Sequence, residues 1–63
     1  MRIKYFVQDG ENNELLQEHD RNIHVSTMIL SAKSLYIDHL LYDVIESVFS
    51  FDDDEIQITL IQR

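Results

Sequence analysis

The 63-residue sequence contains no cysteine and no proline, and its single glycine is Gly10. Without cysteine, disulfides and thiolate zinc sites are excluded, and a reducing compartment such as the cytoplasm is expected. Without proline or glycine-rich stretches there is no flexible linker, so we expect residues 1–63 to form one domain. No apolar run approaches the roughly 18 to 20 residues of a membrane span, and no signal-peptide pattern is present.

Basic residues are also scarce. Five lysines and arginines stand against twelve aspartates and glutamates, which gives a formal net charge of −7. Such a chain is a poor binder of nucleic acid or anionic membranes, because binding to phosphates requires lysine and arginine. Its natural partners are basic surfaces. The simpler alternative is that the acidity only maintains solubility.

Hydropathy patterns predict a small α+β fold. Alternation of apolar and polar residues indicates strands at residues 2–8, 23–30 and 55–63. Asp9-Gly10 is a turn signal. Residues 14–19 fit either a second strand or one helical turn capped by Asn13, and we favour the strand. From Leu35 to Phe49 the apolar residues fill one half of a helical wheel, which indicates an amphipathic helix.

These elements predict an antiparallel or mixed sheet of three or four strands, in the order β-(β)-β-α-β, with the helix packed across it. One helix covers only one face of a sheet, yet apolar residues also occupy the opposite positions: Phe6, Met28, Leu30 and Ile61. They either lie at edges and bulges or meet a second subunit. We expect a homodimer, because a domain this small buries only about 60% of the surface of its unfolded chain.

No motif in the sequence supports catalysis. It has no cysteine nucleophile, no glycine-rich phosphate loop and no G-x-S-x-G motif. The carboxylates at 52–55 lack the alternating ligands and central glycine of a calcium loop. His19, His24 and His39 do not form an H-x3-H pair on the expected helix. We therefore expect no enzymatic activity, no cofactor and no metal.

The exposed side of the expected helix and the acidic run after it form the candidate binding site. Asp38, Tyr42 and Glu46 are spaced i, i+4 and i+8, which on a helix gives one ridge with an aromatic between two carboxylates. Exposed aromatics surrounded by charge are typical of binding hot spots. The candidate partner-binding residues are Leu35, Tyr36, Asp38, His39, Tyr42, Asp43, Glu46, Asp52, Asp53 and Asp54. Their carboxylates would replace phosphates in the basic groove of a nucleic-acid-binding protein.

Short motifs also carry a family resemblance: Ser34-Leu35, Leu40-Leu41-Tyr42, Asp54-Glu55-Ile56 and the Gln8-Asp9-Gly10 turn. With them the chain resembles the small uracil-DNA glycosylase inhibitors of Bacillus phages. The resemblance implies an acidic homodimer that mimics DNA in the host cytoplasm and blocks the DNA-binding cleft of that enzyme, with no cofactor and no reaction. In that family a helix-borne aromatic enters an apolar pocket of the enzyme. In this chain Asp38 stands at the position of that aromatic residue. We therefore expect Tyr36 or Tyr42 to take over the role of the aromatic anchor.

Two alternatives stay open. The same mimicry can be directed at another nucleic-acid-binding or defence protein of the host, such as a restriction, CRISPR or transcription protein. A protein of a different class, a small structural or regulatory module, would use its acidity only for solubility.

Overall fold

One helix and five strands make up the computed structural model, which describes residues 1–63 apart from the side chain of Ile23. In chain order they are β1 (Arg2–Asp9), β2 (Asn12–Asp20), α1 (Ile23–Ser31), β3 (Ser34–Ile37), β4 (Leu40–Ser50) and β5 (Glu55–Gln62). The strands form one sheet in the order β2-β1-β5-β4-β3. β1 and β5 are parallel, and all other neighbouring strands are antiparallel. The small α+β fold with a mixed sheet is confirmed.

The two ends of the chain fold as their sequence predicts. β1, β2 and β5 lie where strands are expected, and residues 14–19 belong to a strand rather than to a helical turn. Gly10, with a φ of +64°, closes the turn between β1 and β2. The predicted count of three or four strands and the order β-(β)-β-α-β are wrong. In the middle of the chain the segment predicted as a strand is the helix, and the segment predicted as a helix forms two strands.

Residues 23–31 form α1, although their β-branched side chains predict a strand. The helix begins at Asn22, whose side-chain oxygen accepts a hydrogen bond from the Val25 backbone amide at 3.0 Å. This is the bond of an N-cap residue, which satisfies a free amide of the first turn. The Ser26 hydroxyl also donates to the Asn22 carbonyl at 3.0 Å. The strand predicted at 23–30 is wrong because Asn22 acts as a cap and not as part of a turn.

Residues 35–49 form β3 and β4, joined by a tight turn, so the predicted amphipathic helix is wrong. Asp38 and His39 make the turn, and their φ angles of 50° and 68° are both positive. Two positive φ angles are the signature of the type I′ turn found in two-residue hairpins. Glycine and asparagine favour this turn, so an Asp-His pair gives only a weak signal in the sequence.

A β-bulge in β4 also contributes to the helix-like spacing of apolar residues in this segment. The register of β4 against β5 shifts after Val44, which makes Ile45 an extra residue. Positions on the core side of the sheet therefore step by three residues from Val44 to Ser47, as they also do across the turn from Ile37 to Leu40. Steps of three residues resemble the spacing of a helical face, although the backbone is extended.

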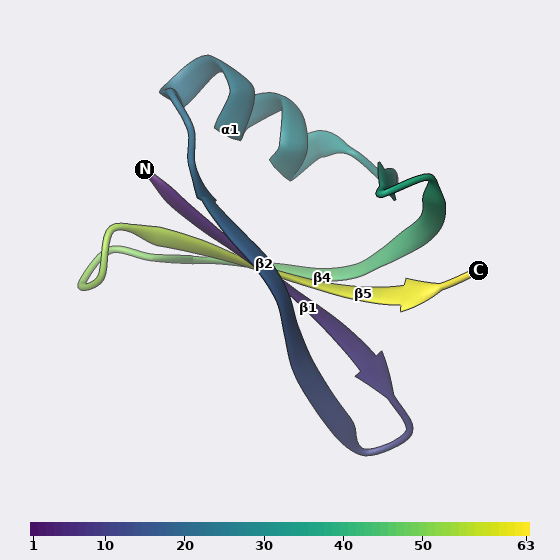
Figure 1. Ribbon diagram of the computed structural model, residues 1–63. Helices are drawn as coiled ribbons and strands as arrows, with labels where there is room; N and C mark the ends of the chain where they lie inside the picture. The colour runs from purple at the N-terminus through teal and green to yellow at the C-terminus, as the bar shows by residue number, and fades with distance from the viewer.

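The core lies on one face of the sheet, the face on which α1 packs (Figure 1). Its fully buried apolar residues come from the two central strands: Ile3 on β1, with Ile56, Ile58 and Leu60 on β5. Tyr5, Ile37 and Tyr42 complete the buried cluster, and Ile29 of α1 packs against it. Figure 1 also shows that the β1–β2 turn and the β4–β5 turn point away from the core in different directions.

The opposite face of the sheet is not covered by α1. Phe6 pairs with Thr59 there, and Ile61 pairs with Asp43. Of the four apolar residues expected to meet a second subunit, Phe6 and Ile61 lie on this face, whereas Met28 and Leu30 lie on α1.

No helix in the described part of the chain has the length and apolar character needed to cross a membrane.

Candidate functional site

The predicted binding residues do not share one ridge. Leu35 and Tyr36 lie on β3, Asp38 and His39 in the turn after it, Tyr42, Asp43 and Glu46 on β4, and Asp52, Asp53 and Asp54 in the turn before β5. β4 has 11 residues. At about 3.3 Å per residue it separates its two turns by much of the length of the molecule. The helical ridge of Asp38, Tyr42 and Glu46 is therefore wrong. The acids are spread along β4: Asp38 lies in the turn before it, Asp43 and Glu46 lie within it, and Asp52, Asp53 and Asp54 lie in the turn after it.

The two candidate aromatic anchors have opposite surroundings. Tyr42 is 5% exposed and belongs to the core, where it lies opposite Leu35. Tyr36 is 76% exposed and pairs with Leu41. Successive side chains of a strand alternate between its two faces, so the two tyrosines point to opposite faces of the sheet. In this fold Tyr36 is accessible to a partner and Tyr42 is not.

Asp43 is engaged within the chain. Its carboxylate forms an ion pair with Arg63, and the Ser34 hydroxyl donates to Asp43 Oδ1 at 3.0 Å. These hydrogen bonds, from Arg63 first and then from Ser34, hold the pKa of the Asp43 carboxyl below its ordinary value. The charge of Asp43 is therefore largely compensated by Arg63 within the chain, so Asp43 is less available than an unpaired aspartate to contact a partner.

The turn between β4 and β5 brings two phenylalanines next to three aspartates, and we call residues 49–54 the acidic tip. The rings of Phe49 and Phe51 are tilted against each other with centroids 4.8 Å apart. Phe51 is nevertheless 91% exposed, and the aspartates at 52–54 are exposed as well. An aromatic side chain left in solvent contributes little apolar burial to folding, so the Phe51 ring is available for contact with another molecule.

Local hydrogen bonds fix the backbone of the acidic tip. The Ser50 hydroxyl donates to Asp53 Oδ2 at 3.2 Å, and the Asp53 backbone amide donates to Ser50 Oγ at 3.3 Å. Asp54 has a φ of +51°, a conformation that aspartate adopts more readily than most residues.

The sequence predicts Asp52, Asp53 and Asp54 as contacts but assigns Phe49 to the core side of a helix. The signal for the aromatic pair is the stretch FSFDDD, which places two phenylalanines directly before the acids.

No positive charge in the nearby sequence neutralises the acidic tip. From residue 34 to residue 62 there are seven acids and no lysine or arginine. Glu55, which follows the tip, is buried and paired: Gln57 Nε2 donates to it at 3.0 Å, and Lys4 Nζ lies 3.3 Å from it. The Gln57 hydrogen bond first, and Lys4 second, lower the pKa of the Glu55 carboxyl. By contrast, Asp52, Asp53 and Asp54 form no ion pair with any described side chain.

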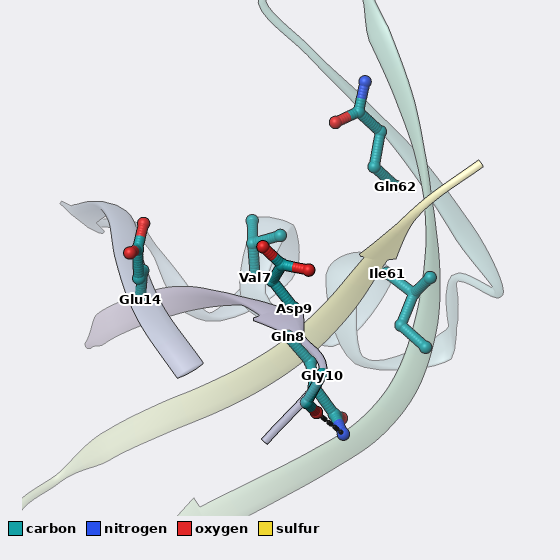
Figure 2. Close-up of a pocket in the computed structure, with 7 residues that line it drawn as sticks. All are labelled: Val7, Gln8, Asp9, Gly10, Glu14, Ile61 and Gln62. Carbon is teal, nitrogen blue, oxygen red and sulfur yellow. Dashed lines mark hydrogen bonds between the residues drawn. The ribbon is translucent and has the colours of Figure 1, made fainter. Parts of the chain in front are cut away.

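A shallow pocket of about 580 Å³ lies at the other end of the sheet, beside the β1–β2 turn. Figure 2 shows the side chain of Gln8 folded back so that its amide donates to the Gly10 carbonyl at 3.3 Å. The carboxylates of Asp9 and Glu14 and the amide of Gln62 also line it, but their polar ends do not converge on a common point (Figure 2). This pocket therefore lacks the focused polar groups that a specific ligand site needs.

The described side chains contain no group of three or more His, Asp or Glu residues arranged to hold a metal ion. The histidines at 19, 24 and 39 lie on β2, on α1 and in the β3–β4 turn, respectively. The acidic tip thus combines Phe51, the most exposed of the described large apolar side chains, with three aspartates that form no ion pair with a described side chain. Comparison of the chain with protein-family models, with curated proteins and with solved structures finds no match.

Proposed function

We propose that this protein is a non-enzymatic binding protein that places its acidic tip on a basic surface of a partner protein. The observation that carries the proposal is the exposed Phe51 ring beside Asp52, Asp53 and Asp54. The ring supplies apolar area for a pocket, and the carboxylates supply charge-assisted hydrogen bonds to lysine and arginine around that pocket. Because the tip is a hairpin turn with bonds of its own, its shape is largely set before binding, which lowers the entropic cost.

The partner is a nucleic-acid-binding protein. Such proteins present lysines and arginines spaced for phosphates, and neighbouring carboxylates satisfy the same donors. Phe51 would occupy a site used by a base, since aromatic rings and bases stack on similar surfaces. Uracil-DNA glycosylase is the first target to test, because of the resemblance carried by Asp54-Glu55-Ile56 and the other short motifs. The anchor proposed here is Phe51 and not a helix-borne tyrosine, since residues 35–49 are strands.

The test compares two triple variants that remove the same charge. One carries Asp52→Asn, Asp53→Asn and Asp54→Asn in the acidic tip. The control carries Asp9→Asn, Glu11→Gln and Glu14→Gln around the β1–β2 turn, so the net charge is the same. Both are assayed for inhibition of purified uracil-DNA glycosylase and for capture of proteins from a bacterial lysate at low salt. We expect the tip variant to lose binding and the control to retain most of it.

The outcomes separate the target from the mode of binding. Inhibition of the glycosylase that only the tip variant loses supports both. Lysate capture that only the tip variant loses, without inhibition of the glycosylase, supports the mode and assigns another nucleic-acid-binding or defence protein as target. If both variants bind as the native chain does, or if both lose binding equally, the acidic tip is not the binding site and the acidity serves solubility.

We also propose a homodimer formed through the sheet face that α1 leaves uncovered. Phe6 lies half-buried on that face beside Leu15, and Ile61 is 41% exposed there. Pairing two such faces would bury these side chains and supply apolar area that a core of this size lacks. In that arrangement the acidic tips extend beyond the sheet of each subunit, so dimerisation leaves them free for the partner.

A further inference from the structure

A second pocket, of about 370 Å³, opens between β2 and β3, the two edge strands of the sheet. Because β2 and β3 do not pair with each other, the curled sheet stays open between them. Apolar walls are provided by Ile29 of α1 and by Leu35 and Ile37 of β3. We call this cavity the edge pocket. It differs from the pocket of Figure 2 because a cation, Arg21, lines it beside the apolar side chains, whereas no lysine or arginine lines the other pocket.

Arg21 is the cation of the edge pocket. Its backbone is held by two hydrogen bonds with Met1, from the Arg21 amide to the Met1 carbonyl at 2.9 Å and from the Met1 amino group to the Arg21 carbonyl at 3.1 Å. Its guanidinium, however, forms no ion pair with a described side chain. By contrast, Arg2, Lys4 and Arg63 are paired with Glu18, Glu55 and Asp43, respectively. Lys33 also forms no ion pair with a described side chain, but it does not border the pocket. In a chain of net charge −7, an arginine left unpaired at a pocket is available for an external anion.

Tyr5 and His19 also line the edge pocket, and Tyr5 lies close enough to Arg21 to feel its charge. Their rings meet edge to face with centroids 6.2 Å apart, and His19 Nε2 is hydrogen-bonded to Gln17 Oε1 at 2.9 Å, which orients the imidazole. Burial raises the pKa of the Tyr5 hydroxyl, and the nearby charge of Arg21 opposes that rise. The hydroxyl is therefore protonated at neutral pH and able to donate a hydrogen bond. It forms none to a described residue.

We propose that the edge pocket binds a small monocarboxylate with an apolar body, its carboxylate on Arg21 and the Tyr5 hydroxyl and its body against Ile29, Leu35 and Ile37. Arginine presents paired donors that match a carboxylate, and the volume lies in the range of about 300 to 1,000 Å³ that is usual for small-ligand sites. Asp38 also borders the pocket. Its charge disfavours a second carboxylate on the ligand, so a dicarboxylate binds less well than a monocarboxylate of the same size.

The test uses benzoate as the probe and follows the backbone and side-chain resonances of the isotopically labelled chain by NMR. Benzoate is expected to shift Arg21, Tyr5, His19 and the β3 residues with one saturable curve and a millimolar dissociation constant, as is usual for a ligand this small. Benzamide, which has nearly the same shape and no charge, and isophthalate, which adds a second carboxylate, are expected to bind at least about tenfold more weakly.

A pair of charge-matched variants then identifies the contact. Arg21→Gln is expected to weaken benzoate binding about tenfold, whereas Lys33→Gln, which removes the same charge outside the pocket, is expected to leave it within about twofold. The proposal is overturned if benzoate produces no saturable shift up to about 10 mM, if the shifts map away from β2 and β3, or if the two variants weaken binding equally. The triple variant of the acidic tip serves as a further control and is expected to bind benzoate normally, because the edge pocket and the tip share no residue.

Discussion

Arg63 and Asp43 form an ion pair that connects the end of β5 to the middle of β4, and the same guanidinium donates to Ser34 Oγ at 3.3 Å. The Arg63 backbone amide also donates to the Leu41 carbonyl at 3.0 Å. Three strands are thereby joined through one polar cluster at the side of the sheet next to β3. β3 has only four residues, and this cluster adds to its pairing with β4 and to the packing of Leu35 and Ile37 against the core.

Replacement of Asp43 by Asn should change how stability depends on pH. The folded pKa of Asp43 lies below its ordinary value of 3.8, so the folded state binds this proton less readily than the unfolded state. The resulting stabilisation is present above the ordinary pKa and is lost as pH falls through the folded pKa. Urea unfolding at pH 6 and pH 3 should therefore show a smaller loss of stability on acidification in Asp43→Asn than in the native chain.

The control for that experiment is Asp52→Asn, which makes the same chemical change in the exposed acidic tip, where no ion pair is formed with a described side chain. Its pH dependence should follow that of the native chain. Equal slopes for all three proteins would show that the Arg63 cluster does not operate in solution.

Substitution of Asn22 by Ala should destabilise the domain by about 1 kcal/mol, because the Val25 amide loses its cap acceptor. In a domain of this size that loss lowers Tm by about 4–8 °C. Asn22→Asp keeps an acceptor oxygen and should melt close to the native chain. Thermal unfolding followed by circular dichroism measures both, and equal Tm values for Asn22→Ala and the native chain would contradict the helix start at Asn22.

Substitution of His39 by Gly should stabilise the β3–β4 hairpin. His39 has a φ of +68°, a conformation that costs a residue with a Cβ up to about 1–2 kcal/mol and costs glycine little. Glycine also gains freedom in the unfolded chain, so we expect a net increase of up to about 1 kcal/mol. His39→Val should be destabilising, since β-branched residues resist positive φ. Chemical denaturation checks the order Gly, His, Val, and the reverse order would indicate a different turn.

If the chain forms the proposed homodimer, a substitution on the uncovered sheet face should change the mass measured by analytical ultracentrifugation. At physiological salt the native chain should sediment at twice its mass of 7.5 kDa. Ile61→Gln, on the uncovered sheet face, should shift the population to monomer. Met28→Gln is the matched control, because Met28 is 71% exposed on α1, away from that face. A monomeric native chain at the highest concentration, or dissociation by both variants alike, would remove the dimer.

Hydropathy patterns in the sequence predict secondary structure correctly where they fit only one type of element. Residues 2–8 and 55–63 place apolar residues at every second position and form β1 and β5, and Gly10 marks the one turn in which glycine is used. The charge asymmetry is equally direct, so Asp52, Asp53 and Asp54 are identified as exposed acids before the fold is known. The role of Phe51 is harder to see, because an isolated aromatic gives no sign of whether it points into a core or into solvent.

The middle of the chain is where sequence patterns mislead. β-branched residues at 23–31 favour a strand, but the Asn22 cap and the packing of Ile29 on the core favour a helix, and tertiary contacts prevail over a weak intrinsic preference. In residues 35–49 the turn at Asp38-His39 and the bulge at Ile45 each interrupt the alternation. The pattern that results fits a helical wheel and is made by two interrupted strands.

The sequence by itself determined an acidic, cysteine-free α+β chain with strands near both ends and three adjacent aspartates before the last strand, because composition and short-range periodicity depend only on neighbours along the chain. The tertiary structure decided which central segment is the helix, that Tyr42 is buried while Tyr36 and Phe51 are exposed, and that Arg21 borders a pocket with Tyr5 and His19. These features depend on register, bulges and the curl of the sheet, which arise from contacts between residues far apart in sequence.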